Sequence, residues 1–447
     1  MQLFPRSYRP PTPLFVCLFV VLSLCLLPRR GAPAPVWTPT LGSMGQAPPA
    51  NYDESKAGTF TLPDPLVFND GKPVKTSREW RKRRRAEILL LLEMNVYGRS
   101  PKPPKHIRFK VFDIDKGALG GKAIRRQVTV YFPTPNAEAH EDLLLYIPAG
   151  AHKPVPVILA LNFFGNQSVT SDPGVKPATV WNGTPPVRQQ APEGSRGADK
   201  GFDVEKILAR GYGFATICYQ DLEPDFKGGY KEGIRQMFLK PGQTEPGPDE
   251  WGAIGAWAYG LSRAMDYLEK DKDVDAHRVA IMGHSRLGKT VLWAGAQDKR
   301  FAMVLSNCSG RGGASPWRRN YGETLQSMSQ VFPFWFCPNL LKYVNQVDKL
   351  PVDSDGLIAL IAPRPVYITA AQEDQWADPR GMFMAAVAAG PVYKLLEAEG
   401  LETDQMPALN QPIMHTIAFH IREGKHAVTA FDWDQFLTFA DRYLRAQ

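Results

Sequence analysis

Residues 279–290 contain the serine whose surroundings most favour chemistry. An apolar run typical of a buried strand leads into Gly-His-Ser-Arg-Leu-Gly-Lys-Thr. A serine on a tight turn between a strand and a helix takes a strained conformation that exposes its hydroxyl, provided that its neighbours are small. We therefore interpret Ser285 as a candidate nucleophile, although Gly283 and Gly288 are spaced one residue wider than in the usual Gly-x-Ser-x-Gly.

Two cations follow Ser285 directly. Arg286 and Lys289 fall in the first turn of the expected helix, where a positive charge opposes the helix dipole. They make sense if an electron-rich group lies above the turn, and the main-chain N–H of Arg286 would point to where an oxyanion forms. The alternative is a small-residue turn that only joins a strand to a helix, and the short pattern alone leaves both interpretations open.

A serine hydroxyl needs a base, and histidine is the usual one. Downstream of Ser285 the chain offers His415, His420 and His426. The first two lie at the ends of an apolar run that resembles a strand, so we expect them to be packed or edge residues. His426 lies in a loop between the last expected strand and the last expected helix, which makes it the candidate base.

The acid that orients the base should follow the strand expected to end near residue 370. Glu373, Asp374 and Asp378 all lie in the next loop. Any of them could instead be a solvated charge or a cap for the helix expected after Pro379. The order of the chain does not choose among the three.

The elements that must position these residues alternate between strands and helices. Expected strands cover residues 107–112, 126–132, 143–147, 155–161, 213–219, 279–283, 303–306, 366–370 and 416–419, and expected helices cover 76–97, 204–210, 251–270, 290–296, 382–399 and 432–446. Early antiparallel strands followed by βαβ units predict an α/β-hydrolase fold, a three-layer α-β-α sandwich with a mostly parallel, twisted central sheet. Residues 230–250 and 315–354 are expected to be loop insertions above the active site.

The N-terminus has the features of a targeting segment. Arg6 and Arg9 precede the apolar run 14–27, which is too short to span a bilayer comfortably, and small residues follow. We predict a signal peptide over residues 1–34, a disordered lead-in over 35–51 and a single catalytic domain over 52–447. This predicts a secreted or periplasmic protein with no stable membrane insertion after the signal is removed; an uncleaved anchor is the alternative.

Composition narrows the possible partners. The 447 residues carry a formal net charge of +8, part of it in the basic run 81–85, which we expect to be the solvated side of a helix. There is no base-reading motif, so nucleic acid is not an expected partner. Cys218, Cys308 and Cys337 remain after signal removal and show no metal-ligand spacing, so we expect no metal and no cofactor. A monomer is expected.

An ordered set of motifs in this chain resembles the bacterial glucuronoyl esterases, a family of carbohydrate esterases. The set comprises Gly-His-Ser-Arg-Leu-Gly-Lys, Glu-Asp-Gln-Trp-Ala-Asp-Pro, Gly-Lys-His followed by Phe-Asp-Trp, and three upstream stretches at residues 96–99, 161–166 and 251–257. The likeness runs from about residue 80 to the C-terminus. It implies hydrolysis of the ester between a 4-O-methyl-glucuronic acid branch of xylan and a lignin alcohol.

The resemblance also implies roles for particular residues. By the family pattern Ser285 is the nucleophile, His426 the base and Asp374 the acid, and the side chain of Arg286 joins the oxyanion hole. Lys289, Glu323 and Trp376 match positions that bind the sugar.

One position departs from the fungal pattern. Cys308 stands where fungal members carry a glutamate, which strengthens Asp374 as the only acid. We expect Cys308 to be a small buried packing residue.

Two other functions remain possible from the sequence. An acetyl xylan or other carbohydrate or aryl esterase of the same fold would use identical chemistry. A non-catalytic carbohydrate-binding protein is a second alternative, against which the apparently intact triad argues.

Overall fold

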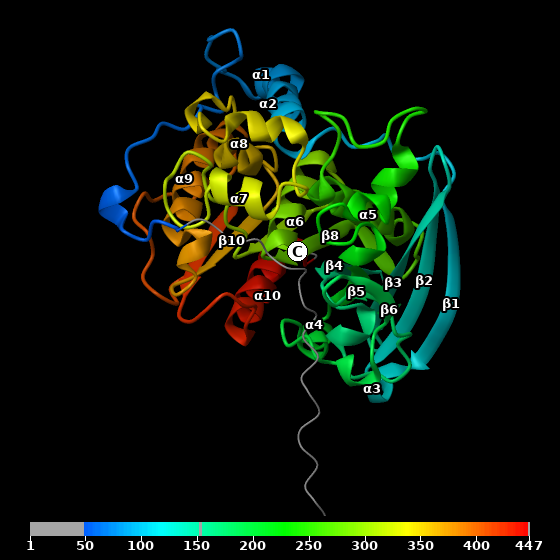
Figure 1. Cartoon of the computed structure of the whole chain (residues 1–447). Helices are drawn as coiled ribbons and strands as arrows, with labels where there is room; N and C mark the ends of the chain where they lie inside the picture. Colours follow the sequence, from blue (N-terminus) through cyan, green and yellow to red (C-terminus); the bar gives the residue numbers. More distant parts are fainter. Residues whose placement is uncertain (1–48, 152–153, 446–447) are drawn as a thin grey trace, which may run out of the picture. The chain divides into compact units, whose positions relative to one another are not determined.

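A ten-stranded sheet organises the computed structural model, which describes residues 49–151 and 154–445 (Figure 1). The strand order is β1-β2-β3-β7-β4-β8-β9-β10-β12-β11. The predicted signal peptide (1–34) and most of the predicted lead-in (35–51) lie outside the described residues. The strands are β1 (Arg108–Gly117), β2 (Ala123–Pro133), β3 (Glu138–Pro148), β4 (Val155–Asn162), β7 (Gly213–Cys218), β8 (Val274–His284), β9 (Met303–Asn307), β10 (Val366–Ala371), β11 (Ile413–Met414) and β12 (Ile417–Arg422).

The sheet has an antiparallel part and a parallel part. β1, β2 and β3 pair antiparallel, and β3 pairs antiparallel with β7. From β7 through β4, β8, β9 and β10 to β12 every pairing is parallel. Parallel neighbours require crossover connections, which the helices supply. The predicted α/β-hydrolase fold with a mostly parallel sheet is therefore confirmed. A separate hairpin joins β5 (Thr179–Asn182) to β6 (Val187–Gln190).

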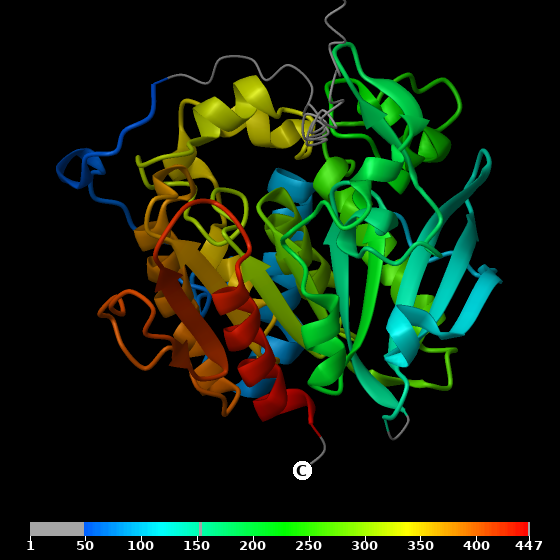
Figure 2. The same ribbon diagram turned by 90° about the horizontal axis from the view of Figure 1, so that it is seen from below.

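Helices cover both faces of the sheet. Along β4, Val157 and Leu159 pack into one core, whereas Ile158 and Ala160 pack into the other, as alternating strand side chains must. The strands lie between the two sets of helices, with α10 in red in Figure 2. One face holds α4 (Val204–Ala209) and α10 (Ala430–Leu444); the other holds α2 (Arg85–Leu92), α5 (Ala253–Leu268), α6 (Arg286–Gln297), α8 (Ser354–Ala359) and α9 (Pro379–Leu395). The remaining helices are α1 (Ser77–Glu79), α3 (Ala118–Gly121) and α7 (Leu325–Val331).

The helix expected over residues 76–97 is present, with two wider turns. Thr76 caps α1 and forms a capping box with Glu79, and Gly98 ends the helical segment at φ 81°. Between these ends, residues Trp80–Arg84 and Glu93–Tyr97 form π-helical turns around α2. None of the described helices has both the length and the apolar character needed to cross a bilayer.

The basic run at residues 81–85 is only partly solvated, which corrects the prediction. Arg84 is buried and donates to Asn69 Oδ1 at 2.8 Å and to Glu87 Oε2 at 3.1 Å. Arg85 is half-buried and donates to the carbonyl oxygen of Ala296 at 2.6 Å. These two arginines therefore find acceptors on Asn69, on Glu87 and on α6, and do not only face solvent.

The two predicted insertions contact different parts of the molecule. Residues 315–354 contribute Glu323 and Trp335 to the surroundings of Arg286 and Lys289. Residues 230–250 do not line the cavity that holds Ser285; residues Glu232–Ile234 and Met237 instead line a polar cavity described below. Neither segment lines the cavity that holds Ser285, but residues 315–354 contact the two cations that follow it.

Candidate active site

Ser285 lies at the junction of β8 and α6 in a strained backbone conformation. Its φ of 60° and ψ of −126° fall outside the regions that ordinary residues adopt. Such strain is retained where the surrounding structure fixes the turn and is typical of functional sites. The N–H of Ser285 donates to the carbonyl oxygen of Asn307 at 2.9 Å, which ties the turn to the neighbouring strand β9.

The two glycines that flank the serine are required by close backbone contacts. A Cβ atom at Gly283 would lie 2.1 Å from the carbonyl oxygen of Leu287. At Gly288 it would lie 2.9 Å from the carbonyl oxygen of Asn307. The wider spacing of this motif therefore still has a steric basis, because α6 begins in direct contact with the end of β8 and with β9.

His426 and Asp374 come together at the carboxyl ends of two neighbouring parallel strands. Asp374 follows β10, and His426 follows β12. His426 Nδ1 lies 2.6 Å from Asp374 Oδ2, and the carboxylate is buried whereas the imidazole is 40% exposed. A carboxylate can only accept here, so the hydrogen bond places a proton on Nδ1 and leaves Nε2 free to accept another.

The other two acids of the loop have different surroundings. Glu373 is exposed, and its main-chain N–H donates to the carbonyl oxygen of Gly424. Asp378 is buried, caps α9 through Gly381, and forms an ion pair with Arg319 at 2.8 Å. The helix cap considered for this loop is therefore Asp378.

The other two downstream histidines are engaged elsewhere. His420 is fully buried between the hydroxyl of Tyr367 at 2.9 Å and Asp432 Oδ1 at 3.0 Å. His415 Nδ1 faces Glu399 at 3.2 Å. Among the three downstream histidines, His426 is the one that shares a cavity with Ser285.

That cavity has a volume of about 450 Å³ and is mostly apolar. Ser285, Arg286 and His426 line it together with His284. An apolar wall lowers the local dielectric constant and strengthens any hydrogen bond to a developing charge. The other lining residues are Leu161, Phe163, Phe164, Asp199, Lys200, Gly201, Phe202, Met282, Ala427 and Val428.

Both cations of the first turn are buried and paired with carboxylates. Arg286 forms an ion pair with Asp225 through Nη1. Lys289 Nζ lies 3.1 Å from Glu323 Oε2 and donates to the carbonyl oxygen of Ser309 at 2.7 Å. Burial lowers the pKa of Lys289, which the charge of Glu323 opposes. The electron-rich groups expected above this turn therefore include two carboxylates of the protein itself, those of Asp225 and Glu323.

Glu323 and Trp376, expected to bind sugar, lie next to each other. The N–H of Glu323 donates to the carbonyl oxygen of Trp376 at 2.8 Å. Trp376 is half-buried, and the Glu323 carboxylate also accepts from the N–H of Arg311 at 3.0 Å. Lys289, Glu323 and Trp376 therefore form one connected group beside the strained turn.

Comparison with known proteins identifies the family of this chain. The family model described as glucuronyl esterase, fungi, matches residues 246–397. A carbohydrate esterase from an unknown prokaryotic organism is 45% identical over 416 residues, which cover 92% of this chain and 95% of the relative. The chain belongs to the glucuronoyl esterases. The family consists of carboxylic ester hydrolases.

Two further comparisons give a bacterial structure and a fungal enzyme. The solved glucuronoyl esterase from Solibacter usitatus is 49% identical, with a TM-score of 0.84, and the match covers 88% of this chain and all of that one. A 4-O-methyl-glucuronoyl methylesterase from Podospora anserina is 28% identical over 328 residues, which cover 70% of this chain and 56% of the relative. The bacterial relative is thus similar along its whole length.

Cys308 lies inside this glucuronoyl esterase site. It is buried at φ 47°, and its sulfur, a carboxylate oxygen of Asp374 and a ring nitrogen of His426 lie within 4.8 Å of one another. Burial, followed by the charge of Asp374, raises the pKa of the Cys308 thiol well above its usual range. These three side chains could hold a metal ion, although the spacing of the cysteines in the sequence does not indicate one.

Two residues beside Ser285 and Arg286 are not predicted from the sequence. His284 Nδ1 lies 2.6 Å from Asn307 Oδ1, and the ring of His284 lies 4.4 Å from that of His426. Burial and the neighbouring His426 lower the pKa of His284 to about 3, so it stays neutral near pH 7. Asp225 is the second missed residue. The sequence offers one weak indication of its role, which is that this carboxylate follows the buried strand β7 by a few residues.

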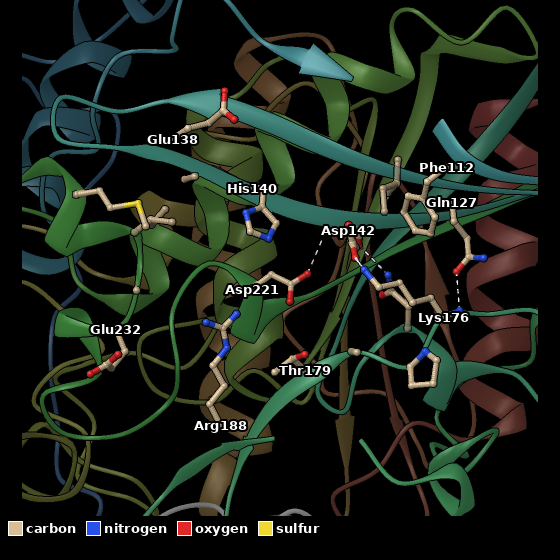
Figure 3. Close-up of a pocket in the computed structure, with 18 residues that line it drawn as sticks. Phe112, Gln127, Glu138, His140, Asp142, Lys176, Thr179, Arg188, Asp221 and Glu232 are labelled. Carbon is tan, nitrogen blue, oxygen red and sulfur yellow. Dashed lines mark hydrogen bonds and ion pairs between the residues drawn. The ribbon is translucent and has the colours of Figure 1, made fainter. Parts of the chain in front are cut away.

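A second cavity, of about 220 Å³, is lined mainly by polar side chains and contains none of these site residues. Figure 3 shows Asp142, Lys176 and Asp221 close together, with Arg188 extending toward Asp221. Lys176 Nζ lies 3.0 Å from Asp142 Oδ2, and Asp221 Oδ2 accepts from the N–H of Asp142 at 3.1 Å. Burial raises the pKa of Asp221 to about 7.

Proposed function

We propose that this chain hydrolyses glucuronoyl esters through Ser285, His426 and Asp374. Ser285 Oγ attacks the ester carbonyl carbon and gives its proton to His426 Nε2. The tetrahedral intermediate collapses, and the alcohol leaves with that proton. Water, activated by the same imidazole, then attacks the acyl-enzyme and releases the uronic acid and free Ser285.

The hydrogen bond of 2.6 Å between His426 and Asp374, in the loop that lines the Ser285 cavity, carries this proposal. A buried carboxylate on Nδ1 fixes the tautomer that a base requires and stabilises the imidazolium that forms. The strained turn at Ser285 is the second support, because such turns present the nucleophile in enzymes of this fold.

Arg286 is the proposed oxyanion group. The ester is neutral in the ground state, and negative charge appears only as the tetrahedral intermediate forms. A fixed guanidinium therefore favours the transition state over the bound substrate. The main-chain N–H of Arg286, at the N-terminus of α6, is a second donor for the same oxygen.

Lys289, Glu323 and Trp376 are the proposed sugar-binding group. The paired Lys289 and Glu323 offer a donor and an acceptor to neighbouring hydroxyl groups, and Trp376 offers a flat ring to a sugar face. We propose that the natural substrate joins 4-O-methyl-glucuronic acid of xylan to lignin alcohols. The protein would act as a secreted or periplasmic monomer with one catalytic domain over residues 52–447.

Rates on three ester classes test the proposal. Purified protein is assayed with methyl 4-O-methyl-glucuronate, acetylated xylan and an aryl acetate, with Ser285→Ala as the blank. We expect kcat/KM on the uronate ester to exceed the other two by at least about tenfold. A higher value on acetylated xylan would contradict the substrate while leaving the serine chemistry intact. No turnover on any of the esters would favour a binding protein.

A further inference from the structure

Asp225 holds one end of the Arg286 guanidinium. Arg286 Nη1 forms an ion pair with the Oδ2 atom of Asp225, and the side chain of Asp225 is only 4% exposed. The indole N–H of Trp335 donates to the other carboxylate oxygen at 2.7 Å, and the hydroxyl of Tyr219 donates to Oδ2 at 3.3 Å. Three donors from separate elements therefore fix this carboxylate.

Aromatic rings further restrict the guanidinium. Arg286 Cζ lies 5.0 Å from the ring centroid of Trp335 and 5.6 Å from that of Phe163. The ring of Trp335 is stacked on Phe332 at 3.8 Å, with an angle of 7° between the planes. Both cation–ring distances are within the attractive range, and the stacked indole cannot easily turn away. The guanidinium therefore has a defined position at the cavity that contains Ser285.

One donor of the guanidinium has no partner in the described part of the chain. Arg286 Nε is buried and makes no hydrogen bond with residues 49–151 or 154–445. Burying a donor without a partner costs free energy, and a hydrogen bond to an arriving acceptor would recover that cost. The pairing of Nη1 with Asp225 leaves this donor uncommitted.

We propose that Asp225 is a positioning residue that holds Arg286 ready for the oxyanion. The inference rests on the proposed function, because it assigns Asp225 a role only through Arg286. An arginine tied by Nη1 needs no reorganisation when charge appears on the substrate oxygen, and this preorganisation is what lowers the barrier. The alternative is an ion pair that only stabilises the loops carrying Tyr219 and Trp335.

A double-mutant cycle separates the two roles. Arg286→Ala, Asp225→Asn and the double variant are compared in kcat and KM on the uronate ester. We expect Arg286→Ala to lower kcat about 10²–10³-fold. Asp225→Asn should lower kcat about tenfold with little change in KM. Asp225→Asn should have no further effect when Arg286 is already alanine, because nothing remains to be positioned.

Three outcomes would overturn the inference, and they differ in what they mean for the proposed function. An equal loss from Asp225→Asn in both backgrounds would leave Asp225 a structural residue. If Arg286→Ala lowers kcat but Asp225→Asn does not, the inference also fails while the proposed function stands. An unchanged kcat in Arg286→Ala would instead remove the oxyanion role and the inference with it, while Ser285→Ala still tests the hydrolysis itself.

A matched control and a milder variant complete the design. Asp172 is another buried carboxylate, bonded to Arg125 at 2.7 Å and to the hydroxyl of Tyr146 at 2.7 Å, and it does not line the Ser285 cavity. Asp172→Asn should lower the melting temperature and leave kcat unchanged. If Asp225→Asn does not fold, Trp335→Phe removes one hydrogen bond to Asp225 and keeps a ring. Its smaller loss of kcat should likewise disappear in Arg286→Ala, and persistence there would overturn the inference.

Discussion

The polar cavity and the cavity at Ser285 differ in how their charged groups are used. The polar cavity of Figure 3 has more ionisable side chains, yet Lys176 and Asp142 already pair with each other there. The cavity at Ser285 is mostly apolar, but it combines a strained serine, an imidazole oriented by Asp374 and a clamped arginine. Density of polar groups is therefore a poor guide to chemistry. A better guide is a donor or acceptor that the fold holds in place without giving it a hydrogen-bond partner.

The largest effect should come from removing the nucleophile. We expect Ser285→Ala to lower kcat by about 10⁴-fold or more, since the covalent route is lost. The fold should be retained, because alanine fits wherever serine does. Initial rates and the melting temperature measure the two effects. Activity close to that of the unmodified protein would remove Ser285 from the mechanism and erase the contrast between the cavities.

The next effect concerns the orientation of His426. Asp374→Asn preserves the shape of the side chain but offers an amide N–H to the imidazole, which favours the wrong tautomer. We expect kcat to fall by about 10³–10⁴-fold while KM changes little. Asp378→Asn is not a suitable control because Asp378 caps α9, but Glu373→Gln is, since Glu373 is exposed beside Asp374. An equal loss in Glu373→Gln would contradict the assignment of the acid.

A smaller effect is expected at the proposed sugar-binding group. Glu323→Gln keeps an acceptor for the N–H of Arg311 but removes the charge that pairs with Lys289. We expect KM for uronate esters to rise about tenfold, with a smaller change in kcat, because the interaction serves binding more than bond breaking. KM for a small aryl acetate should not change. If both values of KM stay constant, Glu323 does not contact the sugar.

The smallest effect on activity should come from the polar cavity. Its Asp221 has a pKa raised to about 7 by burial, so the folded protein retains a proton that the unfolded chain releases near its ordinary value. Stability therefore falls as the pH rises from about 4 to about 7, where the unfolded chain has released this proton and the folded protein still holds it, and this group has no further effect above that range.

Asp221→Asn is uncharged at every pH and keeps the acceptor for Asp142. The stability of the variant relative to the unmodified protein should therefore increase between pH 5 and pH 7, by at most about 1.4 kcal/mol per pH unit, and level off above pH 7. Denaturant unfolding at several pH values measures it. A loss of kcat/KM in this variant would mean that the two cavities are coupled.

The sequence predicted the parts of the site that depend on local order. Ser285 is recognisable because a buried strand, two glycines and a helix surround it within a few residues. His426 follows from its place between the last strand and the last helix. The order of the chain left Glu373, Asp374 and Asp378 open as the acid, and only the family resemblance selected Asp374. Asp374 lies beside His426 because β10 and β12 are parallel neighbours, and this pairing is known only from the structure.

The parts that the sequence did not predict depend on contacts between distant segments. Arg286 and Lys289 are recognisable as cations in the sequence, but their pairing with Asp225 and Glu323 is not. Both partners lie on loops, and hydrophobic periodicity does not predict the path of a loop. The prediction that the whole basic run is solvated is wrong for a similar reason, because Arg85 donates to the carbonyl oxygen of Ala296, which is distant in the sequence. The helix α7 was missed because it is short and lies within an insertion, although its Thr324 cap was a usable signal.

Trp335 faces two cations at once. Its ring lies 5.0 Å from Arg286 Cζ and 5.7 Å from Lys289 Nζ, and its indole N–H is bonded to Asp225. Under the proposed function, one indole therefore contacts both the oxyanion arginine and the sugar-binding lysine. A substitution at this position should change kcat and KM together, so the two cannot be tuned separately through it.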